Sequence, residues 1–364
     1  MAYKMDYEKI AAALQFPTEE IVDVVIDTDA YNEVDDQYAI AWALCSPERI
    51  HVEAVYAAPY CTHAIARLMT QPGQEPPRLT REMMGSGIHF AGTPAEGMEL
   101  SYQEILRLFA LMGVSPDGRV FRGSTAYIED TPGRQPVESE AARDLVRRAM
   151  DRPEGKRLYV LSIGAITNVA SALMMEPAIA GKITVVWLGG QPPYFKNGME
   201  FNLVQDMVSS QHILNCGVPL VLIPCQGVAS HLSVTAPELT ALLMGRSKVG
   251  DYLGQSVLDA LKPSSGGPLF MKGCTGGMDD VPVEVCKMYP TKTTAPSRIV
   301  WDIATVGYVM NPNWTTSSLT PSPILNDDMT WDHDNSRHPI RLCYYLNRNP
   351  IFGDLFEKLA SAGK

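Results

Sequence analysis

Four aspartates crowd into residues 27–36 (DTDAYNEVDD), directly after an apolar run. Asp27 and Asp29 have the spacing of a strand, so their side chains would point the same way, while Asp35 and Asp36 would begin a helix. Carboxylates this close repel one another unless a cation neutralises them, and a hard, oxygen-binding ion such as Ca²⁺ or Mg²⁺ is the natural partner. Helix capping would explain one aspartate, but four predict a functional site.

A phosphatase is a second functional interpretation of the same stretch. The DTD of residues 27–29 resembles the DxD of haloacid dehalogenase-type phosphatases. There the first carboxylate, here Asp27, would attack phosphate, and the second would act as acid and base with Mg²⁺. A DxD pair is a weak signal by itself, so the other motifs must decide.

Polar residues also follow later apolar runs. After the run 158–163, Thr167 and Asn168 open a helical pattern and can present a backbone carbonyl and an amide. In VWDIA (300–304), Asp302 lies between apolar residues, where a charge is costly unless it is paired or bound to metal. Each of these residues would also fit a helix cap.

The segment NGMEFN (197–202) follows another apolar run and a Gly-Gly pair. Glu200 and Asn202 lie two residues apart, so in an extended segment they would face the same direction. An acid with an amide suits hydrogen bonding to sugar hydroxyls. Asp206, further on, would cap a helix over 207–214.

The elements that must position these residues alternate between strands and helices. Continuous Val/Ile/Leu runs are typical of strands buried on both faces, and their alternation with helices favours a parallel sheet with right-handed crossovers. Helices are expected at 37–44 and 168–175, and a further element starts within 298–309. The strands are predicted at 21–26, 52–57, 158–163, 183–188 and 218–223. We therefore predict an α/β fold with a mostly parallel, Rossmann-like central sheet, helices on both faces and the site at the carboxyl ends of the strands.

Length and composition favour a single large domain over 1–364. The chain has 364 residues, and no internal repeat or linker divides it. Two Gly/Pro-rich stretches, at about 71–97 and 262–297, look like insertions. Loops of this length are either functional covers of a site or peripheral decoration.

Charge and hydropathy exclude several classes of partner. The net charge of −11 argues against a nucleic-acid-binding surface. No apolar run reaches the roughly 18 residues needed to cross a bilayer, and the charged N-terminus lacks a signal-peptide apolar region. The seven cysteines are scattered without a CxxC, so neither a disulfide framework nor a structural zinc site is expected. These features predict a soluble, cytoplasmic protein.

Taken in order, the motifs resemble the inosine-uridine-preferring nucleoside hydrolases, the calcium-dependent ribohydrolases. That family carries DxD…DD, then Gly-x-x-Thr-Asn, then GG…EFN…D, and a late His-Asp before an apolar helix. In this chain the corresponding motifs fall at 27–36, 164–168, 189–206 and 301–302. VFRGS (120–124) also looks like a segment of the family, and the resemblance covers about residues 21–357. The ordered set is far more specific than any one motif, and the phosphatase interpretation gives EFN no role.

The resemblance implies a calcium site and an acid–base group. Asp29 would take the proton from the attacking water and would also bind Ca²⁺. Asp36, Asp302 and the backbone carbonyl of Thr167 would be the other calcium ligands, and Asp27 would orient the cluster. Cleavage of the N-glycosidic bond builds oxocarbenium-like charge on the sugar, and a cation that holds ribose and water together fixes the attack geometry.

The resemblance also implies a substrate and an assembly. Asp35, Glu200 and Asn202 would hold ribose hydroxyls, with Asn197 as a further contact. The substrate would be a small nucleoside, and the protein would be a homodimer or homotetramer.

The largest departure from the family is Trp301. Many members have a His at this place, which is proposed to protonate the leaving base, whereas an indole has no acid–base function and only donates. Trp301 could instead stack on the base. His333 is the predicted replacement acid, because a His-Asp pair can tune an acid near neutral pH. Tyr60, His89 and Arg122 are the other candidates.

Two further departures concern the surroundings of the site. The loop 30–34 is two residues longer than the family's, and an Asn after the second strand has no equivalent in AAPY (57–60). The missing His leaves a third interpretation open, that of a nucleoside-binding or sugar-binding protein without catalysis.

Overall fold

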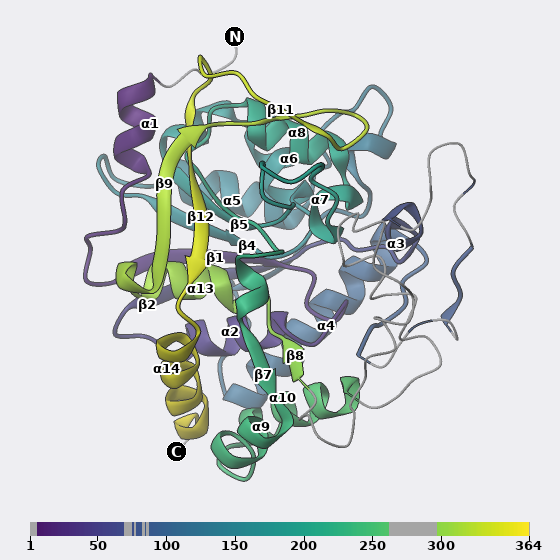
Figure 1. Ribbon diagram of the computed structural model, residues 1–364, viewed down its shortest axis with the longest axis vertical. Helices are drawn as coiled ribbons and strands as arrows, with labels where there is room; N and C mark the ends of the chain where they lie inside the picture. Colours follow the sequence, from purple (N-terminus) through teal and green to yellow (C-terminus); the bar gives the residue numbers. More distant parts are fainter. Residues whose placement is uncertain are drawn as a thin grey trace.

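The computed structural model describes residues 6–68, 75, 78–81, 84, 87–261 and 297–363. Its centre is an eight-stranded sheet in the order β3-β2-β1-β4-β5-β6-β12-β9 (Figure 1). Every neighbouring pair in this sheet is parallel except β12–β9, which confirms the mostly parallel α/β prediction. The strands are β1 (Val22–Thr28), β2 (Ile50–Ala57), β3 (Val120–Arg122), β4 (Leu158–Ser162), β5 (Ile183–Leu188), β6 (Leu220–Ile223), β9 (Thr315–Pro321) and β12 (Pro339–Leu346).

Helices cover both faces of the sheet, because successive residues of a strand point to opposite sides. Val24 and Ile26 of β1 pack in one apolar cluster with α2, α4, α10, α13 and α14, whereas Val25 packs in a second with α5, α6 and α8. These helices are α2 (Asp36–Leu44), α4 (Pro94–Met112), α10 (Lys248–Ala260), α13 (Ile303–Met310), α14 (Arg348–Ser361), α5 (Glu140–Met150), α6 (Thr167–Met175) and α8 (Met207–Asn215). The shorter helices are α1 (Tyr7–Ala13), α3 (His63–Leu68), α7 (Phe201–Gln205) and α9 (Ala236–Leu242).

The predicted strands and helices correspond to β1, β2, β4, β5, β6, α2 and α6, but the C-terminal part differs. The stretch 298–309 holds two elements, β8 (Ser297–Ile299) and α13, and β8 pairs antiparallel with β7 (Ser233–Thr235) outside the main sheet. β9 reads TTSSLTP, a polar edge strand with no apolar run, so the hydrophobic pattern does not reveal it. A second ribbon joins β10 (Ile324–Leu325) to β11 (Trp331–Asp332). The predicted insertion 262–297 lies outside the described residues apart from Ser297.

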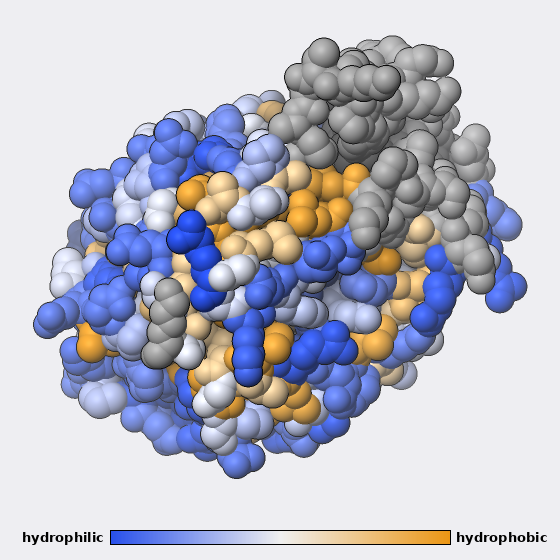
Figure 2. Space-filling model, turned by 90° about the horizontal axis from the view of Figure 1, so that it is seen from below, coloured by the Kyte–Doolittle hydropathy of each residue, from blue (hydrophilic) through white to orange (hydrophobic). Residues whose placement is uncertain are grey.

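No helix in the described part of the chain has the length and apolar character to cross a membrane. Exposed large hydrophobic side chains lie on different elements: Tyr7, Ile21, Met150, Tyr194, Leu242 and Tyr345. The face shown in Figure 2 mixes hydrophilic and hydrophobic residues. Scattered exposed apolar residues of this kind are ordinary for a globular domain.

Candidate active site

The carboxyl end of β1 and the start of α2 carry the acidic cluster. β1 is an apolar run buried on both faces, so the sheet fixes the direction in which the chain leaves it. Asp35 precedes α2 and Asp36 is its first residue, at the end of the helix that favours negative charge. Both carboxylates, like that of Asp29, are only 2% exposed.

Three carboxylates from two distant segments converge here. Asp35, Asp36 and Asp302 each offer an oxygen, and these oxygens all lie within 4.8 Å of one another. The backbone N–H of Trp301 donates to Asp35 Oδ2 at 2.8 Å, and Thr28 Oγ1 donates to Asp36 Oδ1 at 2.6 Å. We call Asp35, Asp36 and Asp302 the carboxylate trio. Buried oxygen donors packed this closely fit a hard divalent cation.

The electrostatics of the trio explain why it needs a counter-charge. Burial, with the charge of Asp35 next in size, raises the pKa of Asp36 to about 8. Burial also raises the pKa of Asp302 well above its usual range, with Asp35, Asp36 and Asp29 adding to the effect. Without a cation, the trio therefore holds protons near neutral pH, and a bound cation would displace them.

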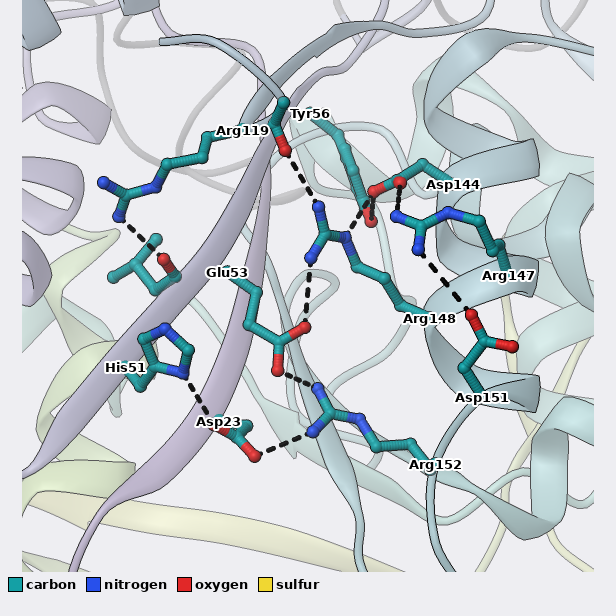
Figure 3. A network of polar contacts seen from close by, with 12 residues as sticks. Asp23, His51, Glu53, Tyr56, Arg119, Asp144, Arg147, Arg148, Asp151 and Arg152 are labelled. Carbon is teal, nitrogen blue, oxygen red and sulfur yellow. Dashed lines mark hydrogen bonds and ion pairs between the residues drawn. The ribbon is translucent and has the colours of Figure 1, made fainter. Parts of the chain in front are cut away.

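The opposite end of β1 offers a contrast. Asp23, His51 and Glu53 also bring ligand atoms within 4.8 Å of one another, but arginines neutralise this group (Figure 3). Arg152 pairs with Asp23 at 2.7 Å and also with Glu53, and Arg148 pairs with Glu53 at 3.1 Å. These carboxylates form direct ion pairs with arginines, whereas Arg298, whose charge lowers the pKa of Asp35, forms its ion pair with Glu33. The carboxylate trio is therefore the better candidate for a metal.

Asp27, near the carboxyl end of β1, is fully buried. Asn168 Nδ2 donates to Asp27 Oδ1 at 2.8 Å, and Ser162 Oγ donates to Asp27 Oδ2 at 3.3 Å. Burial raises the pKa of Asp27 to about 7, while both hydrogen bonds lower it. Gly123 packs so closely that a Cβ there would lie 1.9 Å from the carbonyl oxygen of Ala57. With both oxygens engaged, Asp27 is suited to orienting its neighbours rather than to attacking a substrate.

Asp29 lies just beyond β1. Its carboxylate accepts a hydrogen bond from Gln205, a residue that the sequence interpretation missed. Gln205 Nε2 approaches Asp29 Oδ2 at 3.5 Å, and the side chain of Gln205 is fully buried. Burial and the charge of Asp36 raise the pKa of Asp29. Gly164 leaves room for this carboxylate, because a Cβ there would lie 3.0 Å from Asp29 Oδ1. Only the position of Gln205 beside EFN could have indicated it.

The EFN motif lies at the carboxyl end of β5, as its order in the chain suggests. Glu200 is the N-cap of α7 and accepts the backbone N–H groups of Asn202, Leu203 and Gly190 at 2.9, 3.1 and 2.7 Å. Asn202 Nδ2 donates to the carbonyl oxygen of Leu188 at 3.0 Å. These two side chains, both predicted to bind ribose, therefore connect α7 to the end of β5.

Thr167 begins α6 at the carboxyl end of β4. Its hydroxyl donates to Asp206 Oδ2 at 2.8 Å, and the calcium contact through its backbone carbonyl stays a prediction. Asp206 accepts the backbone N–H of Ser209 at 3.2 Å, which confirms it as the N-cap of α8. It also accepts the N–H of Ile128 at 2.9 Å.

Three other predicted site residues lie on separate loops. Trp301 is half-buried, and its backbone touches the trio through Asp35. Asn197 forms a bridge to Thr330, and its side chain accepts the N–H of Met199 at 3.2 Å. His333 lies exposed in the loop after β11. Among the described residues, no recorded contact joins its ring to the carboxylates, so its catalytic role stays a prediction.

The longer loop 30–34 adds two pairs that the sequence interpretation did not foresee. Tyr31 stacks on His89 with ring centroids 3.7 Å apart, and Glu33 forms an ion pair with Arg298. Burial raises the pKa of Glu33 to about 7, and Arg298 opposes this rise. The described part of the 71–97 insertion thus reaches the site through His89.

The remaining replacement candidates differ in position. Tyr60 is completely buried, and Asp29 adds to the rise that burial produces in the pKa of its hydroxyl. Arg122 instead pairs with Glu99 at 2.8 Å and is 42% exposed, which is typical of a surface ion pair. Tyr60 lies close enough to the cluster to affect its electrostatics, whereas Arg122 is engaged elsewhere.

Comparison with known proteins identifies a family for the sequence and similar folds among solved structures. Residues 24–321 match the family model of the inosine-uridine preferring nucleoside hydrolases. The putative pyrimidine-specific ribonucleoside hydrolase RihB of Shigella boydii is 26% identical to this chain. The match covers 44% of this chain and 65% of the relative's own length, which is less than two thirds. A plant nucleoside hydrolase superposes over 93% of this chain and 99% of its own at 16% identity, with a TM-score of 0.60. A purine-preferring ribonucleoside hydrolase from Gardnerella vaginalis superposes over 93% of this chain and 98% of its own at 15% identity, also with a TM-score of 0.60.

Proposed function

The chain belongs to the inosine-uridine preferring nucleoside hydrolase family, and from this premise we propose that it hydrolyses the N-glycosidic bond of a ribonucleoside, or of a close N-riboside, to ribose and free base. The observation that carries the proposal is the buried carboxylate trio with Asp29 beside it. This arrangement lies at the carboxyl edge of a parallel sheet, where such folds bind ligands.

Calcium is the cofactor that we propose for this site. Asp29, Asp36, Asp302 and the carbonyl of Thr167 would hold it, and the geometry adds Asp35 to these candidates. A bound Ca²⁺ supplies positive charge that keeps the carboxylates ionised and accepts oxygen ligands from a substrate. The buried oxygens of Asp35, Asp36 and Asp302, all within 4.8 Å of one another, support such an ion.

The chain's own residues would do the proton transfer and the binding. Asp29 would accept a proton from the attacking water, because it is buried and held by an amide at one oxygen only. Asp35, Glu200 and Asn202, with Asn197, would orient the ribose. His333 is the predicted proton donor to the leaving base, and Trp301 would stack on that base.

We also propose, from the family resemblance, that the protein is a cytoplasmic homodimer or homotetramer. Light scattering of the purified protein tests the assembly directly. A monomer at micromolar concentration would contradict it.

Release of ribose from a panel of nucleosides in Ca²⁺ buffer tests the function. Purines and pyrimidines both belong in the panel, because the relatives' names divide between pyrimidine-specific and purine-preferring enzymes. Asp29→Ala should abolish release. Asp23→Ala, at the other end of the same strand, should preserve it.

The same panel separates the alternatives. A phosphatase would hydrolyse phosphate esters and would need Asp27 as nucleophile, which the two hydrogen bonds to its oxygens disfavour. A binding protein would retain nucleoside without releasing ribose, as calorimetry would show. Either result, with no ribose released by folded, calcium-loaded protein, would overturn the proposed hydrolase.

A further inference from the structure

Gln205 connects Asp29 to two other elements through one buried amide. Its Oε1 accepts the backbone N–H of Cys61 at 3.0 Å and the hydroxyl of Tyr127 at 2.8 Å. With both hydrogen bonds directed at the oxygen, the amide orientation is fixed, and Nε2 must point toward Asp29 Oδ2. The N–H···O distance of 3.5 Å is long, as hydrogen bonds of catalytic groups often are before substrate binds.

The same amide fixes the segment that carries Tyr60. Cys61 follows Tyr60 directly, and the N–H of Ala58 donates to the carbonyl oxygen of Thr28 at 2.7 Å. Gly97 packs against the backbone of Tyr60 so tightly that a Cβ there would lie 2.0 Å from the Tyr60 carbonyl oxygen. The position of Tyr60 relative to the end of β1 is therefore set from both sides.

The hydroxyl of Tyr60 is buried and has no hydrogen-bond partner among the described residues. A buried hydroxyl without a partner loses about 1–3 kcal/mol of solvation, so its presence calls for a ligand or a water. The charges of Asp29, Glu96 and Asp36, together with Tyr31, add to the rise that burial produces in the pKa of this hydroxyl. Asp29 is the group that acts on the attacking water in the proposed function.

We propose that Gln205 is a positioning residue for the Asp29 carboxylate, and that the Tyr60 hydroxyl hydrogen-bonds the water that Asp29 deprotonates. The inference rests on the proposed function and adds two residues to it. Hydrogen bonds to both Asp29 and Tyr60 would orient this water, so that a lone pair on its oxygen can point at C1′ of the ribose.

The reaction balances without any further reactant. The water oxygen forms a bond to C1′ and gives one proton to Asp29. The C1′–N bond breaks, and its electron pair leaves with the base, which gains a proton from His333, the acid of the proposed function. Asp29 then returns its proton to solvent and His333 takes one up, so the net reactants are the nucleoside and one water. Tyr60 keeps its own proton throughout and acts only through its hydrogen bond.

Two substitutions isolate these roles. Tyr60→Phe removes the hydroxyl alone, and Gln205→Glu keeps an acceptor for Cys61 and Tyr127 while it replaces the donor that faces Asp29. For each, we expect kcat to fall by about 10- to 100-fold, with KM changed less than about threefold. Tyr308→Phe is the matched control, since Tyr308 also carries a buried hydroxyl without a described partner, packed against Phe16 away from the site. It should keep full activity.

Competition between water and methanol as nucleophiles distinguishes a role in positioning the water from a general structural effect. In water–methanol mixtures, Tyr60→Phe should change the ratio of methyl riboside to ribose at least twofold, whereas Tyr308→Phe should not. An unchanged ratio together with an unchanged kcat in Tyr60→Phe would overturn the role of Tyr60. Wild-type activity in Gln205→Glu would overturn the role of Gln205.

A high-resolution crystal structure keeps the inference testable if no nucleoside is cleaved. An ordered water within hydrogen-bond distance of both Tyr60 Oη and Asp29, absent from Tyr60→Phe, would support the arrangement even if the hydrolase proposal failed. A Tyr60 hydroxyl bonded to a protein group, or one with no water beside it, would overturn the arrangement whatever the activity.

Discussion

Replacing Asp302 by asparagine should stabilise the metal-free protein and remove its response to calcium. The substitution keeps the shape of the side chain and removes two of the three carboxylate pairs in the trio. Two ionised carboxylates separated by 4.8 Å repel by about 3.5 kcal/mol at an effective dielectric constant of about 20. Because the trio takes up protons to relieve this repulsion, we expect a gain of about 1–3 kcal/mol in the free energy of unfolding.

Calcium should stabilise wild type but not the Asp302→Asn variant. A ligand present at a hundred times its Kd stabilises the folded state by about 2.7 kcal/mol. For a chain of 364 residues this corresponds to a rise in Tm of about 3–4 °C. Wild type should show this rise between EDTA and Ca²⁺, and Asp302→Asn should show little of it although its Tm in EDTA is about 1–4 °C above that of wild type.

Thermal unfolding in EDTA and in Ca²⁺, with calorimetric titration of Ca²⁺, measures both effects. Asp23→Asn is the control, because Asp23 belongs to the other group that could hold a metal but pairs with Arg152 at 2.7 Å. It should keep the full calcium response and change stability by no more than about 1 kcal/mol. A calcium response that survives in Asp302→Asn, or disappears in Asp23→Asn, would refute the assignment of the trio.

The remaining predictions concern pH, packing and an arginine outside the site. In EDTA, the free energy of unfolding should fall as pH rises from about 4 to 8, because the raised pKa of Asp36, about 8, means that the folded state holds a proton that the unfolded state has lost. Saturating Ca²⁺ should flatten this slope in urea unfolding, and a slope of opposite sign in EDTA would contradict the reasoning. Gly123→Ala should lower the free energy of unfolding, measured in urea, by about 1–3 kcal/mol. The added Cβ would lie 1.9 Å from the Ala57 oxygen and 2.4 Å from Asn168 Nδ2. An unchanged free energy of unfolding would mean that the strand ends can separate freely. Asn168→Leu should lower the free energy of unfolding by about 1–3 kcal/mol and should also lower kcat, because it leaves Asp27 without its amide donor. An unchanged kcat would show that Asp27 does not orient the cluster. Arg122→Ala should keep kcat and KM in the ribose-release assay, and a tenfold loss of kcat would place Arg122 in the site despite its pairing with Glu99.

Local sequence was enough to predict the part of the site that belongs to single elements. The run before Asp27 is apolar on both faces, and such a run specifies a buried strand without reference to the rest of the chain. Four aspartates after it must then lie at the strand's carboxyl end. The order of the TN and EFN motifs after β4 and β5 places them at the same edge for the same reason.

Tertiary structure decided which of these side chains meet. Asp302 joins Asp35 and Asp36 only because the chain returns to the front of α2 at the start of α13, a path that no local pattern encodes. This convergence made Asp35, predicted as a ribose contact, a member of the trio as well. The ligands and roles themselves stay predictions, because carboxylate geometry alone fits several hard cations.

Gln205 and His333 show the difference between sequence pattern and tertiary position. Gln205 belongs to no motif but contacts Asp29, whereas His333 belongs to a motif but lies on an exposed loop. Apart from its position beside EFN, Gln205 has no signal in the sequence, and it reaches Asp29 from the end of the short helix α7. His333 forms a His-Asp pair in the sequence but lies on the exposed loop after β11. Hydrophobic periodicity and turn residues act between neighbours along the chain, so they were enough to predict β1, β2, β4, β5 and β6, the order of the motifs and the acidic edge of the sheet. They did not reveal the polar edge strand β9. The distances between side chains from separate segments depend on how the helices pack on the sheet, and the tertiary structure alone set them.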